Sequence, residues 1–373
     1  MGEARATVSP EPERYATLDA WRGLACLLVV GFHAVGRWVD ETHQGLACAP
    51  IRLLGAGGSI GVPLFFTISG WCIAAAAGVA AAAGTPARRF LARRFRRIYP
   101  PYFAALALAV LLALAGRVLS LGPPDGPVWD RTDVGAHWIT NLTLLEEPLQ
   151  MFGVEPVHVI APAWSLDHEQ QFYVFMAFLF AAAAATTRRR ALVAMSVLSV
   201  AATAAFGARR LGILLDTWPL FALGIWAHER GRAREPRGRL GLDLWAGGTV
   251  AALLAAYAIR TGRLGQEAKQ VVICAAFAVG LVALRRHDAA LMRSAPVRLL
   301  AALGRRSYSL YLVHFPIVMT IGDALYPAGW TRGPRLYATA LLSTAVSLAV
   351  AWVFYRVVER RFLSRPPTVP DSP

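Results

Sequence analysis

The chain has 373 residues, of which 56% are hydrophobic and only 16% are charged, and its formal net charge at pH 7 is +15. This composition excludes an ordinary soluble domain and is typical of a polytopic membrane protein. The positive charge does not indicate nucleic-acid binding, because the basic residues form short clusters between apolar stretches, as they do where charge orients membrane helices. Cys48 alone among the four cysteines lies in a predicted loop, so we expect no disulfide framework.

Ten segments are long and apolar enough to span a bilayer, which predicts an all-α polytopic membrane helix bundle. They cover roughly residues 17–38, 58–83, 99–119, 164–185, 191–207, 210–228, 241–260, 269–285, 307–326 and 336–358. With ten spans both termini lie on one side, and most of the 38 arginine and lysine residues belong to that side. The positive-inside rule therefore predicts that both termini are cytoplasmic.

We expect one transmembrane domain over residues 17–360, flanked by a cytoplasmic N-terminal segment (1–16) and a disordered cytoplasmic tail (361–373). The longest connection, about 117–163, is predicted to lie outside and includes the Gly- and Pro-rich stretch 122–127. Long connections in compact domains are often functional. Two interpretations are open for this one, a lid or acceptor site on the outer face and a plain spacer.

The first predicted helix carries Arg22 and His33 on one face. They are separated by eleven residues, which is about 16 Å of helical rise and almost a whole number of turns. Ionisable groups inside a spanning helix are costly and usually face a protein interior or a wet cavity. A neutral imidazole as deep as His33 can accept a proton from a hydroxyl, or it can simply bond to another helix. Arg22 either binds a ligand or marks the inner interface by snorkelling.

Six arginines crowd residues 88–97, just before the third predicted span. They are either a topological signal that touches anionic lipid or a binding surface. Arg94 and Arg97 are three residues apart, hence on one face if the segment is helical. Two neighbouring guanidinium groups suit a phosphate or pyrophosphate. A cytosolic donor that carries a nucleotide would meet this surface first.

Two acids, Asp167 and Glu169, follow the long connection at the start of the fourth predicted span. Asp167 is explained by the helix dipole, which favours acids in a first turn. Glu169 lies further in and is expected to face the bundle interior, where a carboxylate needs a partner. Topology places Glu169 and His33 in the same outer half, which allows a contact between them. The polar stripe from residue 307 to 314 is interpreted as helix packing.

Together these segments make the chain resemble the acyltransferase-3 family of polytopic membrane O-acyltransferases. The resemblance rests on five stretches in the family's order, LDAWRGLACLLVVGFHA, GVPLFFTISGW, RRFRRIYPPY, PAWSLDHEQQFY and SYSLYLVHFPI. By resemblance, His33 matches the histidine held to be catalytic and Glu169 the acid of the Trp-Ser-Leu…Glu motif. Arg22 matches the arginine that begins the first helix, and Arg94 and Arg97 match the donor-side pair. Gln170 departs from the pattern, since a second acid is frequent there.

The resemblance implies a multi-pass enzyme of the bacterial cytoplasmic (inner) membrane that takes an acyl group from acetyl-CoA, or another acyl-CoA, without a metal. The acceptor it implies is a hydroxyl of a glycan or a glycosylated small molecule. We expect the coenzyme A phosphates at Arg94 and Arg97, with Arg22 as a further contact, and the pantetheine arm along the face of the first helix. His33 then acts as the base or carries the acyl group, and Glu169 orients its imidazole.

A transporter or flippase for a lipid-linked glycan is the alternative function, with Arg22 and His33 lining its pathway. It predicts movement of a substrate without turnover of a thioester. The sequence shows no internal repeat of the kind common in secondary transporters, and the five family stretches also favour the enzyme.

Overall fold

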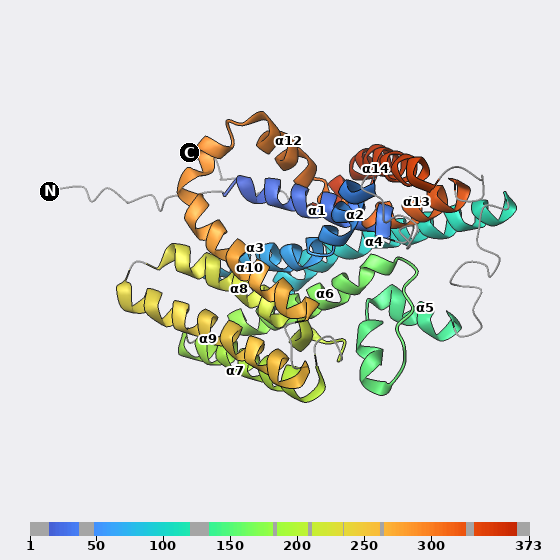
Figure 1. Cartoon of the computed structure of the whole chain (residues 1–373). Coiled ribbons are helices and arrows are strands. Elements are labelled where there is room, and N and C mark those ends of the chain that lie inside the picture. Colours follow the sequence, from blue (N-terminus) through green and yellow to red (C-terminus); the bar gives the residue numbers. More distant parts are fainter. Residues whose placement is uncertain are drawn as a thin grey trace, which may run out of the picture.

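The computed structural model describes residues 15–36, 48–119, 134–181, 185–207, 211–233, 235–261, 265–325 and 332–363. Within these ranges the chain is helical and contains no strand (Figure 1). The long helices are α1 (Thr17–Gly36), α3 (Gly61–Ala82), α4 (Ala87–Val118), α6 (Trp164–Ala181), α7 (Ala185–Phe206), α8 (Leu214–Arg232), α9 (Pro236–Thr261), α10 (Gln266–Leu284), α13 (Ser307–Leu325) and α14 (Arg332–Val357). Each predicted span therefore corresponds to a helix, and the all-α membrane bundle is confirmed.

Shorter helices, which the sequence did not predict, connect the long ones. They are α2 (Ala49–Gly58), α5 (Val134–Thr143), α11 (Asp288–Leu291) and α12 (Ala295–Gly304), with the 3-10 turns η4 (Glu147–Phe152), η5 (Ala161–Ala163), η6 (Arg285–His287) and η7 (Glu359–Arg361). Most of the two predicted terminal segments, residues 1–14 and 364–373, lies outside the described residues.

Within the described part of the chain, eight helical stretches are long and apolar enough to cross a membrane. The helices α6 and α8 are not among them, because α6 carries the polar run 167–171 and α8 ends in the polar run 228–232. Both lie inside the bundle, where α8 packs against α3, α7, α9 and α10, and α6 packs against α3, α4 and α8 (Figure 1). Protein surrounds them in place of lipid, so polar side chains are tolerated.

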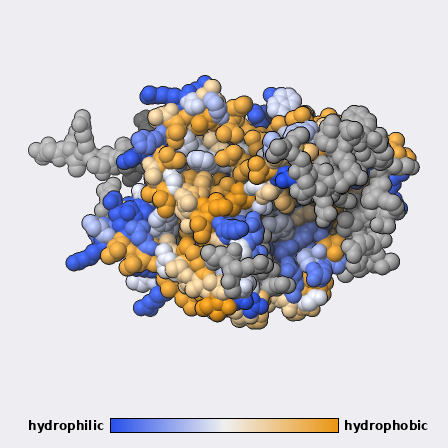
Figure 2. Space-filling view, in the orientation of Figure 1, coloured by the Kyte–Doolittle hydropathy of each residue, from blue (hydrophilic) through white to orange (hydrophobic). Residues whose placement is uncertain are grey.

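The surface agrees with a membrane protein. Figure 2 shows hydrophobic side chains over much of the visible face, with hydrophilic ones at the left-hand end, where Figure 1 places the beginning of α1, and in further patches at the top and near the centre. That end includes the basic connection 229–240.

Helix α4 begins at Ala87, so the predicted start at residue 99 was wrong. The arginine-rich stretch is itself helical, and Pro86, with ψ of 143°, supplies the extended residue before the first turn. Pro100 and Pro101 lie inside the helix. A helical start at Ala87 places Arg94 and Arg97 on one face, as their spacing predicts.

The first half of α1 is clamped between neighbouring elements. Asp288 accepts hydrogen bonds from the backbone N–H of Thr17 at 2.8 Å and from its hydroxyl at 2.7 Å, which caps the helix. Helix α12 lies against the same half with its backbone in direct contact, since a Cβ built on Gly304 would lie 1.6 Å from the carbonyl oxygen of Asp19. This packing fixes the rotation of α1 and hence the direction of Arg22.

The described part of the long connection, 134–163, is folded onto the bundle. The Tyr99 hydroxyl of α4 donates to the Thr143 carbonyl at 2.8 Å, and the Tyr102 hydroxyl donates to the Asn141 carbonyl at 2.9 Å. Gln170 of α6 donates to the carbonyl of Thr143 at 3.2 Å. These bonds attach the segment to α4 and α6; the Gly- and Pro-rich stretch 122–127 lies outside the described residues.

Candidate active site

One pocket opens between α1, α3, α4, α6 and α13 and contains about 770 Å³ of empty space, including the part open to solvent. Ligand sites are typically concave and mostly apolar, with a few convergent polar groups. Its apolar wall comes mainly from α3 and includes Val62, Phe65 and Phe66. Its polar lining residues are Arg22, Ser69, Cys72, Arg94, Arg97, Ser165, Glu169, Tyr173, Ser307, Tyr308 and Tyr311.

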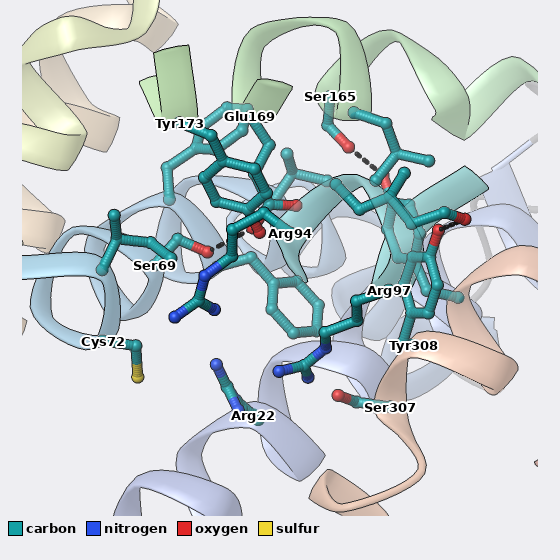
Figure 3. A pocket seen from close by; sticks show the side chains of 17 residues that line it. Arg22, Ser69, Cys72, Arg94, Arg97, Ser165, Glu169, Tyr173, Ser307 and Tyr308 are labelled. Carbon is teal, nitrogen blue, oxygen red and sulfur yellow. Dashed lines mark hydrogen bonds between the residues drawn. The ribbon is translucent and has the colours of Figure 1, made fainter. Parts of the chain in front are cut away.

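Three guanidinium groups converge in this pocket, those of Arg22 from α1 and of Arg94 and Arg97 from α4 (Figure 3). Among the described residues, neither Arg94 nor Arg97 has a carboxylate within ion-pair distance. The Arg94 guanidinium instead lies 5.8 Å from the ring centre of Tyr173. Arg22 lies 4.0 Å from Asp19, one turn back on its own helix. The cluster is thus largely unneutralised.

Among the described residues, Glu169 is the one acid that lines the pocket, and its carboxylate is held by two hydroxyls. Its Oε1 accepts hydrogen bonds from Ser69 of α3 at 2.9 Å and from Tyr173, one turn along α6, at 2.7 Å. Within the pocket lining one carboxylate therefore faces three guanidinium groups, and Asp19, outside the lining, lies beside Arg22. A partly buried site with this excess of positive charge favours an anionic ligand.

The α13 wall of the pocket is formed by tyrosines that the sequence analysis interpreted as packing residues. The Tyr308 hydroxyl donates to the Ile98 carbonyl at 2.8 Å. The Tyr311 hydroxyl donates to the Pro162 carbonyl at 2.7 Å and lies 2.6 Å from the Ser165 hydroxyl. These bonds tie α13 to α4 and to the start of α6. The signal that could have identified them is the helical spacing of the polar stripe, which places 307, 311 and 314 along one face.

His33 does not line this pocket. Its ring centre lies 5.3 Å from that of His314 and 5.2 Å from that of Phe315. Tyr311, which does line the pocket, has its ring 5.8 Å from His314. Tyr311 thus contacts both the pocket and His314, and His314 in turn contacts His33, which lies further along α1.

The contact between His33 and Glu169 that their topology allows is not among the described interactions. The carboxylate of Glu169 bonds to Ser69 and Tyr173 instead. The reason is that Glu169 faces α3 and the arginines, whereas His33 faces α13. The structure thus brings together Arg22, Arg94, Arg97 and Glu169, and leaves His33 beyond them.

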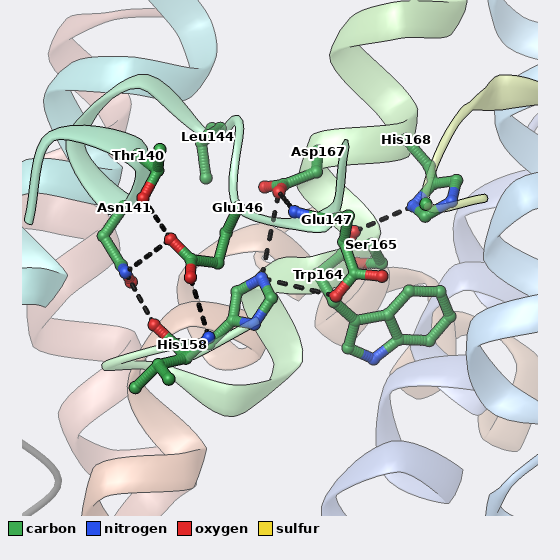
Figure 4. Close-up of polar contacts among 12 residues, drawn as sticks. Thr140, Asn141, Leu144, Glu146, Glu147, His158, Trp164, Ser165, Asp167 and His168 are labelled. Atoms are coloured by element: carbon green, nitrogen blue, oxygen red, sulfur yellow. Dashed lines mark hydrogen bonds and ion pairs between the residues drawn. The ribbon is translucent and has the colours of Figure 1, made fainter. Parts of the chain in front are cut away.

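A second polar cluster lies at the start of α6 (Figure 4). The fully buried Asp167 accepts a hydrogen bond from the backbone N–H of Glu147 at 2.8 Å, so it anchors η4 in addition to its place in the first helical turn. The His158 imidazole lies 3.7 Å from Glu147 and 3.8 Å from Asp167. Burial raises the pKa of Glu147 to about 7, against the opposing effect of His158. Glu146 accepts a bond from the Val157 backbone at 2.7 Å.

Comparison with known proteins agrees with this architecture. The chain matches the acyltransferase domain of the acyltransferase-3 family over residues 15–356. The chain belongs to this family. It is therefore an acyltransferase, and the family together with the apolar helices makes it a multi-pass membrane protein.

Three relatives illustrate the similarity. The chain is 26% identical to "Acyltransferase MdmB" of Streptomyces mycarofaciens, over 98% of this chain and 96% of the relative. It is 28% identical to "Putative membrane-bound transacylase BcsY" of Komagataeibacter xylinus, over 93% of this chain and 82% of the relative. It is 33% identical to "Protein 2 in picA locus" of Rhizobium radiobacter, over 42% of this chain and 78% of the relative. No solved structure matches the chain.

Proposed function

We propose that this acyltransferase transfers an acetyl group from acetyl-CoA to a hydroxyl of a carbohydrate or glycosylated acceptor. The observation that carries the proposal is the meeting of Arg22, Arg94 and Arg97 against the single carboxylate of Glu169. Guanidinium forks match phosphate oxygens in geometry and charge. A nucleotide-bearing acyl donor supplies phosphates for these arginines and an acyl chain for the interior.

In this proposal a long, thin donor arm extends from the arginines toward His33. Arg22 and His33 lie on one face of α1, about 16 Å apart along the helix axis. The Phe65 and Tyr311 rings, 5.8 Å apart between centres, lie at the pocket wall on the way. In this arrangement the phosphates stay at the arginines while the thioester reaches His33.

His33 serves as the base in the proposed reaction. One ring nitrogen takes the proton of the acceptor hydroxyl while the hydroxyl oxygen attacks the thioester carbonyl carbon. The carbon–sulfur bond then breaks, and the coenzyme A thiolate leaves and receives the proton from the imidazolium. In the relay variant, His33 attacks the thioester carbonyl and the coenzyme A thiolate leaves; the acceptor hydroxyl then attacks the acyl-imidazole, His33 is released and the hydroxyl proton passes to the thiolate. Glu169 acts on the donor side, where it sets the charge and position of the arginine cluster.

Donor recognition is tested by equilibrium binding to the purified chain in lipid nanodiscs. Acetyl-CoA is compared with acetyl-pantetheine, which has the same thioester and lacks the phosphates. We expect acetyl-pantetheine to bind at least about 10-fold more weakly, the effect of a single lost charge-assisted contact. The affinity for acetyl-CoA should also fall as salt rises. Equal affinities for the two thioesters would remove the arginine pocket from donor binding.

We further propose that the chain resides in the bacterial cytoplasmic membrane with both termini inside. The support is the concentration of basic residues in the connections that would then be cytoplasmic, such as 84–98 and 285–306. Reporter fusions at the C-terminus and at the outer segment 144–163 test it. If the C-terminal fusion showed the activity of a periplasmic reporter, the proposed orientation would be wrong. The arginine pocket would then face away from a cytosolic donor.

A further inference from the structure

A second histidine lies beside His33 in the core. The ring centres of His33 and His314 are 5.3 Å apart, and their planes are tilted by 43°. His314 is fully buried, and its Nδ1 lies 3.1 Å from the Leu310 carbonyl, one turn back on α13. A carbonyl oxygen can only accept, so Nδ1 carries the proton. In the neutral ring, Nε2 then holds a lone pair.

That lone pair has no hydrogen-bond partner among the described residues. Buried side-chain nitrogens in folded proteins almost always have one, so an orphan acceptor calls for an explanation. The neighbouring Tyr311 cannot supply it, because its hydroxyl proton goes to the Pro162 carbonyl at 2.7 Å. The remaining polar ring in contact is that of His33.

We propose that His314 is a positioning residue for His33, an inference that rests on the proposed function. In the donor-loaded site, Nε2 of His314 accepts a hydrogen bond from the ring N–H of His33. This bond fixes one tautomer of His33 and aims its other nitrogen, with its lone pair, at the acceptor hydroxyl. His314 thereby takes the role predicted for Glu169, whose carboxylate is engaged with Ser69 and Tyr173. The logic is that of hydrolase triads, where a third group holds the base in its working tautomer.

The kinetic test compares two substitutions at His314. His314→Phe keeps the ring shape and removes the acceptor, whereas the side-chain oxygen of His314→Gln restores an acceptor near the position of Nε2. His168→Phe is the matched control, because His168 is also buried and its Nδ1 bonds the Trp164 carbonyl one turn back at 3.1 Å. Its ring instead neighbours Phe66 and Trp164.

The readout is release of coenzyme A thiol from acetyl-CoA in nanodiscs, with octyl glucoside as the hydroxyl acceptor. We expect His314→Phe to lower kcat at least about 10-fold, the low end for groups that orient a working side chain, without a change in the KM for acetyl-CoA. His314→Gln should recover most of the loss, and His168→Phe should keep the wild-type kcat. A His314→Phe variant with wild-type kcat, or a loss that His314→Gln fails to recover, would overturn the positioning role.

A spectroscopic measurement tests the same role without any acceptor. Ring nitrogen chemical shifts of ¹⁵N-histidine-labelled protein with bound acetyl-CoA distinguish the two neutral tautomers of His33, assigned by loss of its signal in His33→Gln. We expect one tautomer in the wild type and a mixture in His314→Phe. An unchanged His33 tautomer would contradict the inference. Full turnover by His33→Ala would instead overturn the proposed function, so the two failures are distinguishable.

Discussion

The pocket makes its sharpest prediction at the arginines of α4. Arg94 and Arg97 line the pocket, whereas Arg93 and Arg96, on the same helix, are exposed and lie outside the lining. Replacing any of these four arginines by alanine removes one positive charge from the same segment. Only the substitutions at Arg94 and Arg97 remove a guanidinium group that can bond a donor phosphate. The substitutions at Arg93 and Arg96 are therefore the control for charge and topology.

The expected magnitude follows from the contacts. A charge-assisted hydrogen bond contributes about 1.5–3 kcal/mol, so Arg94→Ala and Arg97→Ala should each weaken acetyl-CoA binding roughly 10- to 100-fold. Titration of purified protein in nanodiscs at two salt concentrations measures this, and the wild-type affinity should depend more steeply on salt than that of either variant. If Arg93→Ala and Arg96→Ala weaken binding as much as the pocket variants, the arginines act through the general surface charge and the reasoning fails.

Two further predictions concern the frame around the site. Gly304→Ala should lower the free energy of unfolding by about 1–3 kcal/mol or more, because the added Cβ would meet the Asp19 carbonyl oxygen at 1.6 Å. Gly247→Ala is the control and should be neutral or stabilising, because nothing lies within 4 Å of its added Cβ. Equal unfolding temperatures of the two variants would refute the close contact. Glu147 has a pKa raised by burial to about 7 from its ordinary 4.5, so the folded state binds its proton more tightly than the unfolded state. The stability it contributes is complete below about pH 4.5 and is lost as the pH rises through 7. Glu147→Gln should therefore flatten the fall in unfolding temperature between about pH 5 and 8, and an unchanged slope would show that Glu147 does not titrate there.

The helices of the bundle could be predicted because apolar length is a strong signal for a spanning segment. The start of α4 could not be predicted, because arginines end a peak of hydropathy without ending a helix. Helix α4 begins at Ala87 and carries these arginines in its first turns. The helices α2 and α12 were missed because ten residues are too few to stand out by hydropathy. The polar runs of α6 and α8 are visible in the sequence, but the helices that cover them and make this polarity tolerable are visible only in three dimensions.

The site was predicted in its residue types and only partly in its contacts. The shared face of Arg94 and Arg97 could be predicted because the spacing of residues along one helix alone determines which side chains share a face. The partner of Glu169 depends on how α6 is rotated against α3, which no spacing along one helix encodes. For the same reason Tyr308 and Tyr311 were interpreted as packing residues, although their faces form a wall of the pocket.

The central claim is that the acyl group passes to its acceptor at His33, from a donor held by the arginine pocket. The direct measurement is transfer of labelled acetyl from acetyl-CoA to octyl glucoside, followed by mass spectrometry, with donor affinity measured on the same samples. The account predicts that His33→Ala binds acetyl-CoA with wild-type affinity and transfers about 10²- to 10⁴-fold more slowly. Undiminished transfer by folded, donor-binding His33→Ala would contradict it.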